Sequence, residues 1–300
     1  MWATCFTGGA FVAGLAAGRI CDPSVAAPSA EARSDKGATL PAAPAPVAQK
    51  QVAPAAAPAP APAPSPAPAE KAPRAAVETK LIDGKAIAAD VRAELKEMSD
   101  QLEKDYGVRP GLAVILVGQR KDSQSYVRNK KRAAAEANFH TVDVDLPETV
   151  SQEDLLKEVQ ALNDDPKVHA ILVQLPLPKH IDEAEVLKAI RVDKDADGFS
   201  ALNIGNLCLR GGDPPMAVPC TPAGCIELLQ RSGVEVSGKN AVVIGRSNIV
   251  GMPVASLLQS MDATVTVCHS RTRDMISHIR NADIVVAAIG KAEFVRGEWL

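Results

Sequence analysis

The sequence predicts an α/β protein of two domains, preceded by a disordered tail rich in alanine and proline. Its length of 300 residues suits about two compact domains. From position 81 onward, short apolar runs typical of buried strands alternate with segments of helical periodicity. Of the 23 prolines, 13 precede Glu78, so the tail is set apart from the fold. Strands that alternate with helices form parallel sheets covered on both faces.

The tail, residues 1–79, is expected to combine a targeting segment with a linker. An apolar run over residues 8–18 has no acidic residue before Asp22, as in a signal-type segment or an organelle transit peptide. Residues 41–74 form an Ala-Pro tract. Because alternating prolines cannot form a helix or a central strand, we expect an extended polyproline spacer there.

Composition excludes several classes of protein. After residue 77 the chain carries 27 Lys and Arg against 32 Asp and Glu, which gives no electrostatic case for nucleic-acid binding. No run of eighteen apolar residues appears, so we expect no membrane-spanning helix. The 6 cysteines include no C-x-x-C pair, which argues against a disulfide scaffold and against a zinc ribbon. We therefore expect a soluble protein of a reducing compartment, without a metal.

The first series of elements opens with an amphipathic helix, because apolar residues recur there at steps of four and three: Ile87, Val91, Leu95, Met98 and Leu102. The next elements expected are a strand over 112–118 and a helix over 123–138 with Ser123 as its N-cap. A second strand carries Val142, Val144 and Leu146. A capping box at Ser151 then opens a helix whose buried face holds Leu155, Leu156, Val159 and Leu162, and a strand over 168–175 follows.

A second series of the same kind starts at Thr221, read as an N-cap before Pro222. The first element expected is a helix over 223–231 that ends at Gly233. It is followed in order by a strand over 240–244, a helix that ends at Leu258, a strand over 263–268, a helix over 275–280 and a strand over 283–290. This series stops where a further strand is expected, so we interpret the chain as cut short at its C-terminus.

The turn at 245–251, between the first strand and helix of the second series, is a variant of the dinucleotide-binding fingerprint. Ser247 stands where the middle glycine usually lies. Glycines in this turn let a phosphate approach backbone N–H groups at the start of a helix. The position after a strand and before a helix strengthens an otherwise weak pattern.

The turn after the next strand indicates which dinucleotide binds. An NAD site places an acidic residue there for the ribose hydroxyls, but residues 269–273 contain none. Ser270 instead stands beside Arg271 and Arg273, and a hydroxyl near arginines suits a 2′-phosphate. The sequence therefore predicts NADP binding, with a solvated basic turn as the alternative.

The first series carries a second group of candidates. Tyr126 and Lys130 lie four apart on a predicted helix and project from one face, although a packed aromatic beside a solvated lysine would look the same. Gln174 ends a buried strand, where open α/β sheets bind ligands, and a structural glutamine is the alternative. The acid-rich loop over 193–199 lacks the glutamate that closes a calcium loop. A short-chain dehydrogenase is disfavoured, since its cofactor fingerprint precedes its Tyr-x-x-x-Lys pair.

Six motifs, in this order, resemble one family. They are Tyr126-Val-Arg-Asn-Lys130, Val173-Gln-Leu-Pro-Leu-Pro178, Asp193-Lys-Asp-Ala-Asp-Gly-Phe199, Pro219-Cys-Thr-Pro222, residues 238–253 and Ala263-Thr-Val-Thr-Val-Cys-His-Ser270. The chain from residue 81 to residue 300 resembles the bifunctional methylenetetrahydrofolate dehydrogenase/methenyltetrahydrofolate cyclohydrolase family. The resemblance implies a folate-binding catalytic domain over 80–218 and a Rossmann-like NADP-binding domain over 219–300.

The resemblance also implies the roles of single residues. Lys130 matches the catalytic lysine, Tyr126 packs over the folate, and Gln174 hydrogen-bonds and tunes the lysine. Asp197 holds the amide-like edge of the pterin ring, and the folate pocket further includes Ser123, Val173 and Leu175. In the cofactor site, Gly245 belongs to the fingerprint turn, Arg246 and Ser247 cradle phosphates, and Ser270 lies near the 2′-phosphate.

The implied reaction has two steps. Hydride transfer from 5,10-methylenetetrahydrofolate to the nicotinamide gives a methenyl cation, which needs mainly alignment of the two molecules. Water then adds, and the ring opens to 10-formyltetrahydrofolate with the lysine assisting proton movement. The family implies a homodimer. The alternatives are a truncated, non-catalytic remnant or dimer partner of the same family, and a related dehydrogenase acting on a shikimate-type or amino-acid substrate, which is not expected to carry Gln174 and Asp197 in these contexts.

The tail and the resemblance together suggest an organelle. Folate one-carbon enzymes of this type occur in plastids and mitochondria, and the Ala-rich leader suits import. Its basic residues are few, whereas a mitochondrial leader needs an Arg-rich amphipathic helix. We therefore rank the plastid slightly above the mitochondrion, with the cytosol as the alternative.

Overall fold

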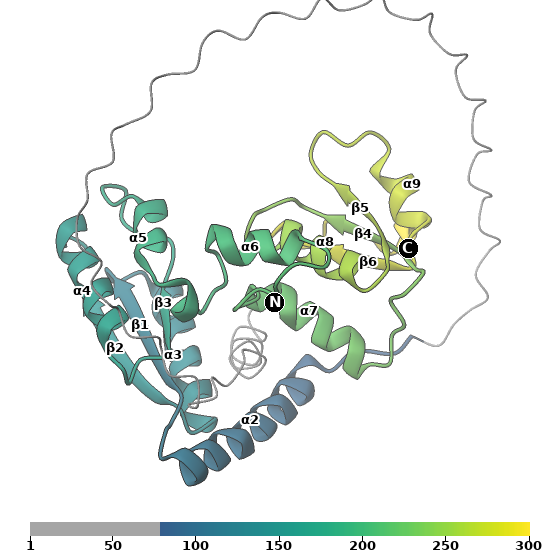
Figure 1. Ribbon diagram of the computed structural model, residues 1–300. Coiled ribbons are helices and arrows are strands. Elements are labelled where there is room, and N and C mark those ends of the chain that lie inside the picture. Colours follow the sequence, from purple (N-terminus) through teal and green to yellow (C-terminus); the bar gives the residue numbers. More distant parts are fainter. Residues whose placement is uncertain (1–78) are drawn as a thin grey trace, which may run out of the picture. The chain divides into compact units, whose positions relative to one another are not determined.

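The computed structural model describes residues 79–300, and strands and helices alternate along them as predicted (Figure 1). The first series comprises α2 (Gly84–Tyr106), β1 (Gly111–Val117), α3 (Lys121–Glu136), β2 (His140–Leu146), α4 (Gln152–Asp164), β3 (Ala170–Val173), α5 (Glu183–Ala189), η1 (Val192–Lys194) and α6 (Ala201–Cys208). The second comprises α7 (Cys220–Arg231), β4 (Asn240–Ile244), α8 (Gly251–Ser260), β5 (Thr264–Cys268), α9 (Met275–Arg280), β6 (Ile284–Ala287) and η2 (Gly297–Trp299). The predicted targeting segment and linker lie outside the described residues, apart from Thr79.

The first sheet is parallel, with strand order β2-β1-β3 and the central strand β1 buried along its whole length. Alternate residues of β1 face opposite sides of the sheet. Leu112 and Val114 pack in one core with residues of α2 and α3, while Ala113 and Ile115 pack in another with residues of α4. Helices therefore cover both faces, which explains why β1 reads as a continuous apolar run.

The second sheet repeats this design with strand order β5-β4-β6, also parallel. Val243 of β4 packs with Val254 and Leu258 of α8 on one face. Val242 and Ile244 pack on the other face, against the core that holds residues of α9. The α/β fold with two parallel sheets is confirmed, and each sheet presents the carboxyl end of its central strand to a following loop and helix.

Three expectations at helix ends and faces are wrong. Met98 is 45% exposed, and Ser99 takes its place on the buried face because that face follows the steps Val91, Leu95, Ser99. Ser123 is no N-cap, since α3 already begins at Lys121 and Ser123 is buried within its first turn. Thr221 is no N-cap either, because α7 begins one residue earlier. Short polar residues therefore indicate that a helix begins nearby, but they do not identify its first residue.

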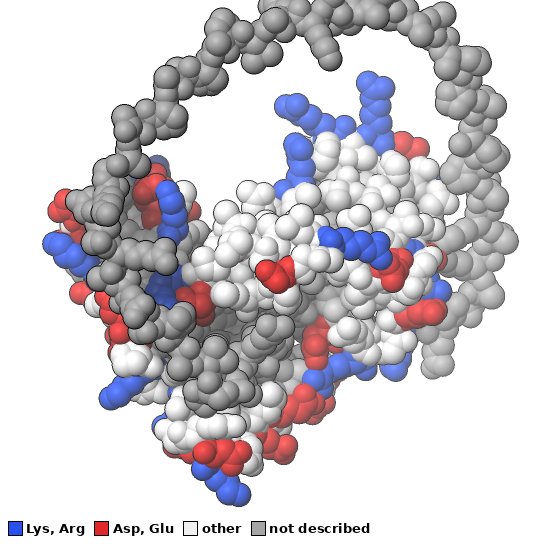
Figure 2. All heavy atoms as spheres, viewed as in Figure 1, with Lys and Arg blue, Asp and Glu red and all other residues white. Residues whose placement is uncertain are grey.

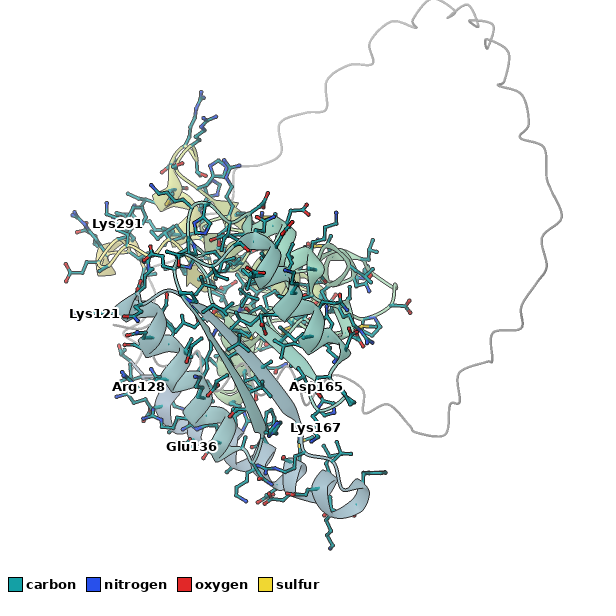
Figure 3. The ribbon with its side chains drawn as sticks, turned by 90° about the vertical axis from the view of Figure 1, so that its left-hand side faces the viewer. Lys121, Arg128, Glu136, Asp165, Lys167 and Lys291 are labelled. Carbon is teal, nitrogen blue, oxygen red and sulfur yellow. The ribbon has the colours of Figure 1, made fainter. Side chains whose placement is uncertain are left out.

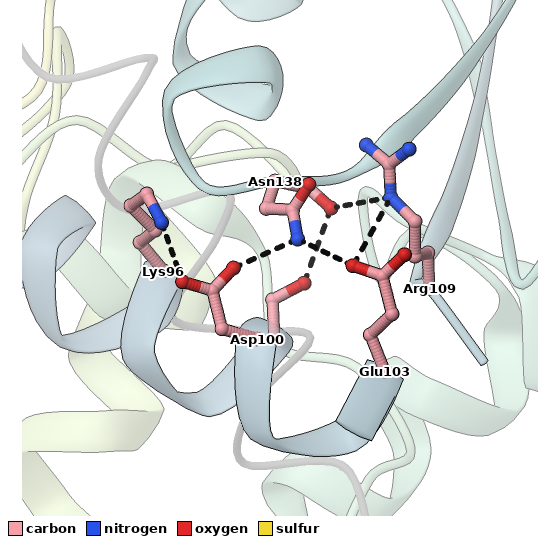
Figure 4. A network of polar contacts seen from close by, with 6 residues as sticks. Lys96, Asp100, Glu103, Arg109 and Asn138 are labelled. Carbon is pink, nitrogen blue, oxygen red and sulfur yellow. Dashed lines mark hydrogen bonds and ion pairs between the residues drawn. The ribbon is translucent and has the colours of Figure 1, made fainter. Parts of the chain in front are cut away.

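A hydrogen-bonded junction joins α2 to the end of α3. Asn138 has a left-handed backbone with φ 59°, and its Nδ2 donates to Asp100 Oδ1 at 2.8 Å and Glu103 Oε2 at 2.9 Å. The Asn138 carbonyl accepts from Ser99 Oγ and from Arg109 Nε, each at 3.2 Å (Figure 4). The junction holds the outer helix α2 to the layer that carries α3.

Charged side chains of both signs intermingle on the face of the molecule shown in Figure 2. Ion pairs near the surface join such side chains within residues 79–300, such as Lys131 Nζ with Asp143 Oδ2 at 3.0 Å. Within residues 79–300, no helix has both the length and the apolar character needed to cross a bilayer.

Candidate active site

The predicted catalytic lysine lies on α3 and reaches the end of the first sheet. Lys130 Nζ donates to Gln174 Oε1 at 3.3 Å, so α3 and the residue that follows β3 meet at this contact. The Gln174 backbone N donates to Ile115 O of β1 at 2.9 Å, and its Nε2 donates to Leu175 O at 2.8 Å. Because Nε2 is held by Leu175, the amide oxygen of Gln174 is turned toward the lysine.

Asp197 joins this group electrostatically. It lies two residues after Asp195, whose backbone bridges Ile171 of β3. Burial raises the pKa of the Asp197 carboxyl, the charge of Lys130 lowers it in part, and the charge of Asp195 raises it further. The first sheet and its neighbouring loop thus bring a lysine, an amide and a carboxyl together.

The remaining residues predicted for the folate pocket lie on the same elements. Ser123 and Tyr126 stand on α3, where Ser123 is buried and Tyr126 is half-buried. Val173 is the last residue of β3 and is buried, and Leu175 packs at the edge of the same core. These four residues flank Lys130 and Gln174 in the chain, and no hydrogen bond between their side chains and those two is found in the described part of the protein.

The predicted cofactor turn follows β4 and requires its glycines. Gly245 has φ 118°, and a Cβ there would lie 2.3 Å from the Ala288 carbonyl oxygen. A Cβ on Gly251 would lie 2.4 Å from the Gly245 carbonyl oxygen. Both contacts are with backbone that cannot move aside, so only glycine fits this strand–turn–helix junction.

The serine in place of the middle glycine has a structural task. Ser247 Oγ accepts from the N–H groups of Val250 at 3.2 Å and Gly251 at 3.3 Å, at the start of α8. Arg246 is exposed. The serine thus orders the start of the helix by accepting from two backbone N–H groups of its first turn.

The second predicted cofactor turn begins beside the first. Ile244 pairs with Cys268 at the ends of β4 and β5, and Gly245 N donates to the Cys268 carbonyl at 2.8 Å. Ser270 is exposed two residues beyond Cys268. The turn that carries it is ordered by His269 N, which donates to Thr272 Oγ1 at 2.8 Å. The two turns therefore leave the same edge of the sheet.

Two family models match the described part of the chain. Residues 82–197 match the catalytic domain of tetrahydrofolate dehydrogenase/cyclohydrolase, and residues 219–300 match the NAD(P)-binding domain of the same enzymes. The chain belongs to the tetrahydrofolate dehydrogenase/cyclohydrolase family. The expected family is thereby confirmed, and every residue predicted for the folate and cofactor sites lies within one of the two matched ranges.

Individual family members are similar over the same part of the chain. Bifunctional protein FolD 2 of Arabidopsis thaliana is 56% identical over 221 residues, which cover 74% of this chain and 74% of that protein. From the same plant, FolD 4, chloroplastic, is 54% identical and FolD 1, mitochondrial, is 49% identical, over 73% and 74% of this chain. The chain spans 61% and 63% of the length of these two relatives.

A solved family structure has the same fold. The Trypanosoma brucei N5,N10-methylenetetrahydrofolate dehydrogenase-cyclohydrolase, complexed with NADP cofactor and inhibitor, superposes with a TM-score of 0.72 at 49% sequence identity. The match covers 75% of this chain and 76% of that chain. Both matched domains of the family are thus present here with the family's arrangement of sheets and helices.

The sequence alone does not single out three residues near Asp197. Asp195 and Asn203 are buried polar residues that hydrogen-bond each other, Asn203 Nδ2 to Asp195 Oδ2 at 3.0 Å. Cys220, at the start of α7, donates to the Ala196 carbonyl at 3.7 Å, and burial raises the pKa of its thiol. Asp195 and Cys220 stand inside the quoted motifs, and Asp195 is distinguished there only by its burial, which a sequence does not report.

A cavity of about 820 Å³ lies on a different face of α3. Its lining includes Gln124, Arg128 and Lys131 of α3 together with Asp145 and Glu148 at and beyond the end of β2. Figure 3 shows Arg128 on the flank of α3, midway along the helix. The cavity contains none of the predicted site residues, because helical spacing turns this face away from Tyr126 and Lys130. Elsewhere in residues 79–300, no group of three His, Cys, Asp or Glu side chains is placed to hold a metal ion.

Proposed function

We propose that this chain oxidises 5,10-methylenetetrahydrofolate with NADP and then hydrolyses the methenyl product to 10-formyltetrahydrofolate. The observation that carries the proposal is the hydrogen bond from Lys130 Nζ to Gln174 Oε1 beside the half-buried Asp197. It gathers three groups of different chemistry at the carboxyl end of a parallel sheet, where ligands of α/β proteins bind. The family match supports the same two reactions.

Each group has a distinct task in this proposal. Lys130 moves the proton when water adds to the methenyl carbon, and Gln174 holds the lysine amine in position through its amide oxygen. Asp197 accepts hydrogen bonds from the amide-like edge of the pterin. Tyr126 packs over the folate, and Ser123, Val173 and Leu175 complete its pocket. Orientation of the one-carbon bridge by these contacts is what the hydride step requires.

The turns after β4 and β5 fit a phosphorylated dinucleotide. Gly245 and Gly251 leave no room for side chains beside the turn backbone, and the exposed Arg246 offers a cation to a phosphate. Ser270 and the basic residues around it suit a 2′-phosphate, with no acidic residue over 269–273 to repel it. NADP bound there would supply the nicotinamide that accepts the hydride.

We further propose the organisation around this activity. Residues 80–218 form the folate-binding catalytic domain and residues 219–300 the NADP-binding domain, and the chain acts as a homodimer. Residues 1–79 direct it to an organelle, the plastid ahead of the mitochondrion. Relatives carrying both compartment names support an organelle in general. Fusion of residues 1–80 to a fluorescent protein in a plant or algal cell tests the address, and a diffuse or secreted reporter contradicts it.

Two spectrophotometric assays test the activity. The purified 300-residue chain is expected to reduce NADP in the presence of 5,10-methylenetetrahydrofolate and to accelerate the loss of methenyltetrahydrofolate absorbance. NAD in place of NADP is expected to give a much lower kcat/KM. A chain that binds NADP but catalyses neither reaction would support the non-catalytic alternative instead.

A further inference from the structure

Asp195 is a buried carboxylate that accepts hydrogen bonds from residues around Asp197. Its Oδ1 accepts from the backbone N of Gly198 at 3.0 Å. Its Oδ2 accepts from the backbone N of Ser200 at 2.8 Å and from Asn203 Nδ2 at 3.0 Å. Three donors therefore fix one carboxylate, and through it they fix the backbone on both sides of Asp197.

Asn203 also hydrogen-bonds the segment that leads to α7. Its Oδ1 accepts from the backbone N of Met216 at 2.9 Å and of Ala217 at 3.3 Å. Gly198 packs against the same segment, since a Cβ on it would lie 2.7 Å from the Ala217 carbonyl oxygen. Asn203 is only 1% exposed, so its Oδ1 and Nδ2 have no water to replace these partners.

The turn is also tied to the sheet that bears the candidate site. Ala196 N donates to the Ile171 carbonyl of β3 at 3.2 Å, next to the bridge between Ile171 and Asp195. Gln174 follows the same strand three residues later. Movement of the Asp195 turn would therefore shift Asp197 relative to the Lys130–Gln174 contact.

We propose that Asp195 and Asn203 are positioning residues, which hold Asp197 beside Lys130 and thereby set the affinity of the site for folate. The inference rests on the proposed function and names residues that act on the substrate only through Asp197. The carboxylate of Asp195 also acts directly on its neighbour, because its negative charge adds to burial in raising the pKa of Asp197. A purely structural pair would affect the amount of folded protein and not these properties of Asp197.

The test compares Asp195→Asn and Asn203→Ala with Asp193→Asn in the full chain. Asp193 is an exposed carboxylate of the same loop that pairs with Arg191, so its variant controls for loss of a charge. Asp195→Asn is expected to raise the KM for methylenetetrahydrofolate about tenfold, the size of one lost hydrogen bond to a charged group, with little change in kcat or in the KM for NADP. Asn203→Ala is expected to act in the same direction.

Titration of the Asp197 carboxyl by carbon-13 NMR supplies a readout that does not depend on turnover. Asp195→Asn is expected to lower the pKa of Asp197, whereas Asn203→Ala keeps the charge of Asp195 and leaves that pKa close to the wild-type value. Thermal unfolding reports how much of each variant is folded. Asp193→Asn is expected to match wild type in all measurements.

The outcomes separate the two proposals. Equal folate KM values in all folded variants, with kcat falling only as folded protein is lost, overturn the positioning role. An unchanged Asp197 titration in Asp195→Asn does so as well. If the wild-type chain catalyses neither reaction, the proposed function fails, and the Asp197 titration still decides whether Asp195 acts on Asp197. If Asp195→Asn does not fold, the kinetics of Asn203→Ala decide.

Discussion

A single side chain, Lys130, separates the two reactions proposed for this site. Lys130→Met keeps the length and apolar stem of the side chain but removes the amine that contacts Gln174. We expect cyclohydrolase activity to fall by more than about a hundredfold, the range of a lost general acid–base group. Thermal unfolding should change little, because Lys130 is only half-buried. Steady-state kinetics of methenyltetrahydrofolate hydrolysis measure the loss.

The next residue on α3 provides the matched control. Lys131 carries the same charge but pairs with Asp143 on β2, away from Gln174. Lys131→Met is therefore expected to retain the hydrolytic rate within about twofold, since its partner is Asp143 rather than a predicted site residue. Full cyclohydrolase activity in folded Lys130→Met, or equal losses in both variants, contradicts the role of Lys130.

Ser270 is the residue expected to set the choice between NADP and NAD. Ser270→Asp places a carboxylate where the 2′-phosphate is proposed to lie, so repulsion should weaken NADP binding by about a few kcal/mol and NAD binding far less. Ser270→Asn introduces a side chain of nearly the same size as that of aspartate but without its charge, so it controls for bulk. Isothermal titration with both dinucleotides measures the difference. Parallel changes in NADP and NAD affinity would show that the 2′-phosphate lies elsewhere.

Among the elements, the junction between α2 and α3 depends on one asparagine. Asn138 combines a φ of 59° with two side-chain hydrogen bonds to α2. Asn138→Ala should lower the free energy of unfolding by about 1–2 kcal/mol, because alanine disfavours the left-handed backbone and cannot donate. Asn138→Gly relieves the backbone penalty and loses only the hydrogen bonds, so it should cost less. Chemical denaturation of both variants measures the order, and a glycine variant less stable than the alanine variant contradicts this account.

The regular elements were largely predictable from the sequence. Strands such as β1 and β4 are continuous apolar runs because both faces of each sheet are covered, and that pattern is legible in one sequence. The short helices α5 and α6 were not predicted. With 7 and 8 residues they are too short to show a clear periodicity, and caps at Asp182 and Ser200 are their main local signals.

The candidate site was predictable only in part for a related physical reason. Lys130 and Gln174 come from motifs whose residue types suit catalysis, and their contact follows from the sheet that brings α3 beside the end of β3. Asp195 and Asn203 were missed because their importance lies in burial and in backbone partners up to 14 residues away along the chain. A polar residue in a loop gives no sign of whether water or the protein surrounds it.

For the whole molecule, the carboxylate that the proposed folate site requires at Asp197 reduces the stability of the fold. Burial raises the pKa of this carboxyl above its ordinary value of 3.8, so the native state holds the proton more tightly than the unfolded chain does. The contribution of Asp197 to stability therefore falls as the pH rises from 3.8 through the raised native pKa. Above its raised native pKa, the ionised carboxylate of Asp197 destabilises the fold, in return for its proposed role in the folate site.

Asp197→Asn tests this opposition directly. The amide has the shape of the carboxyl without its charge, so the melting temperature should rise by a few degrees at pH 7, about 2–4 °C for each kcal/mol gained. The gain should shrink as the pH is lowered toward 3.8, where the wild-type carboxyl is protonated as well. Folate binding should weaken at the same time, because the amide offers one acceptor where the carboxylate offers two. Asp213→Asn, at an exposed carboxylate, controls for the change in net charge. If the melting temperature of Asp197→Asn is at or below that of wild type across this pH range, the carboxylate of Asp197 does not destabilise the fold.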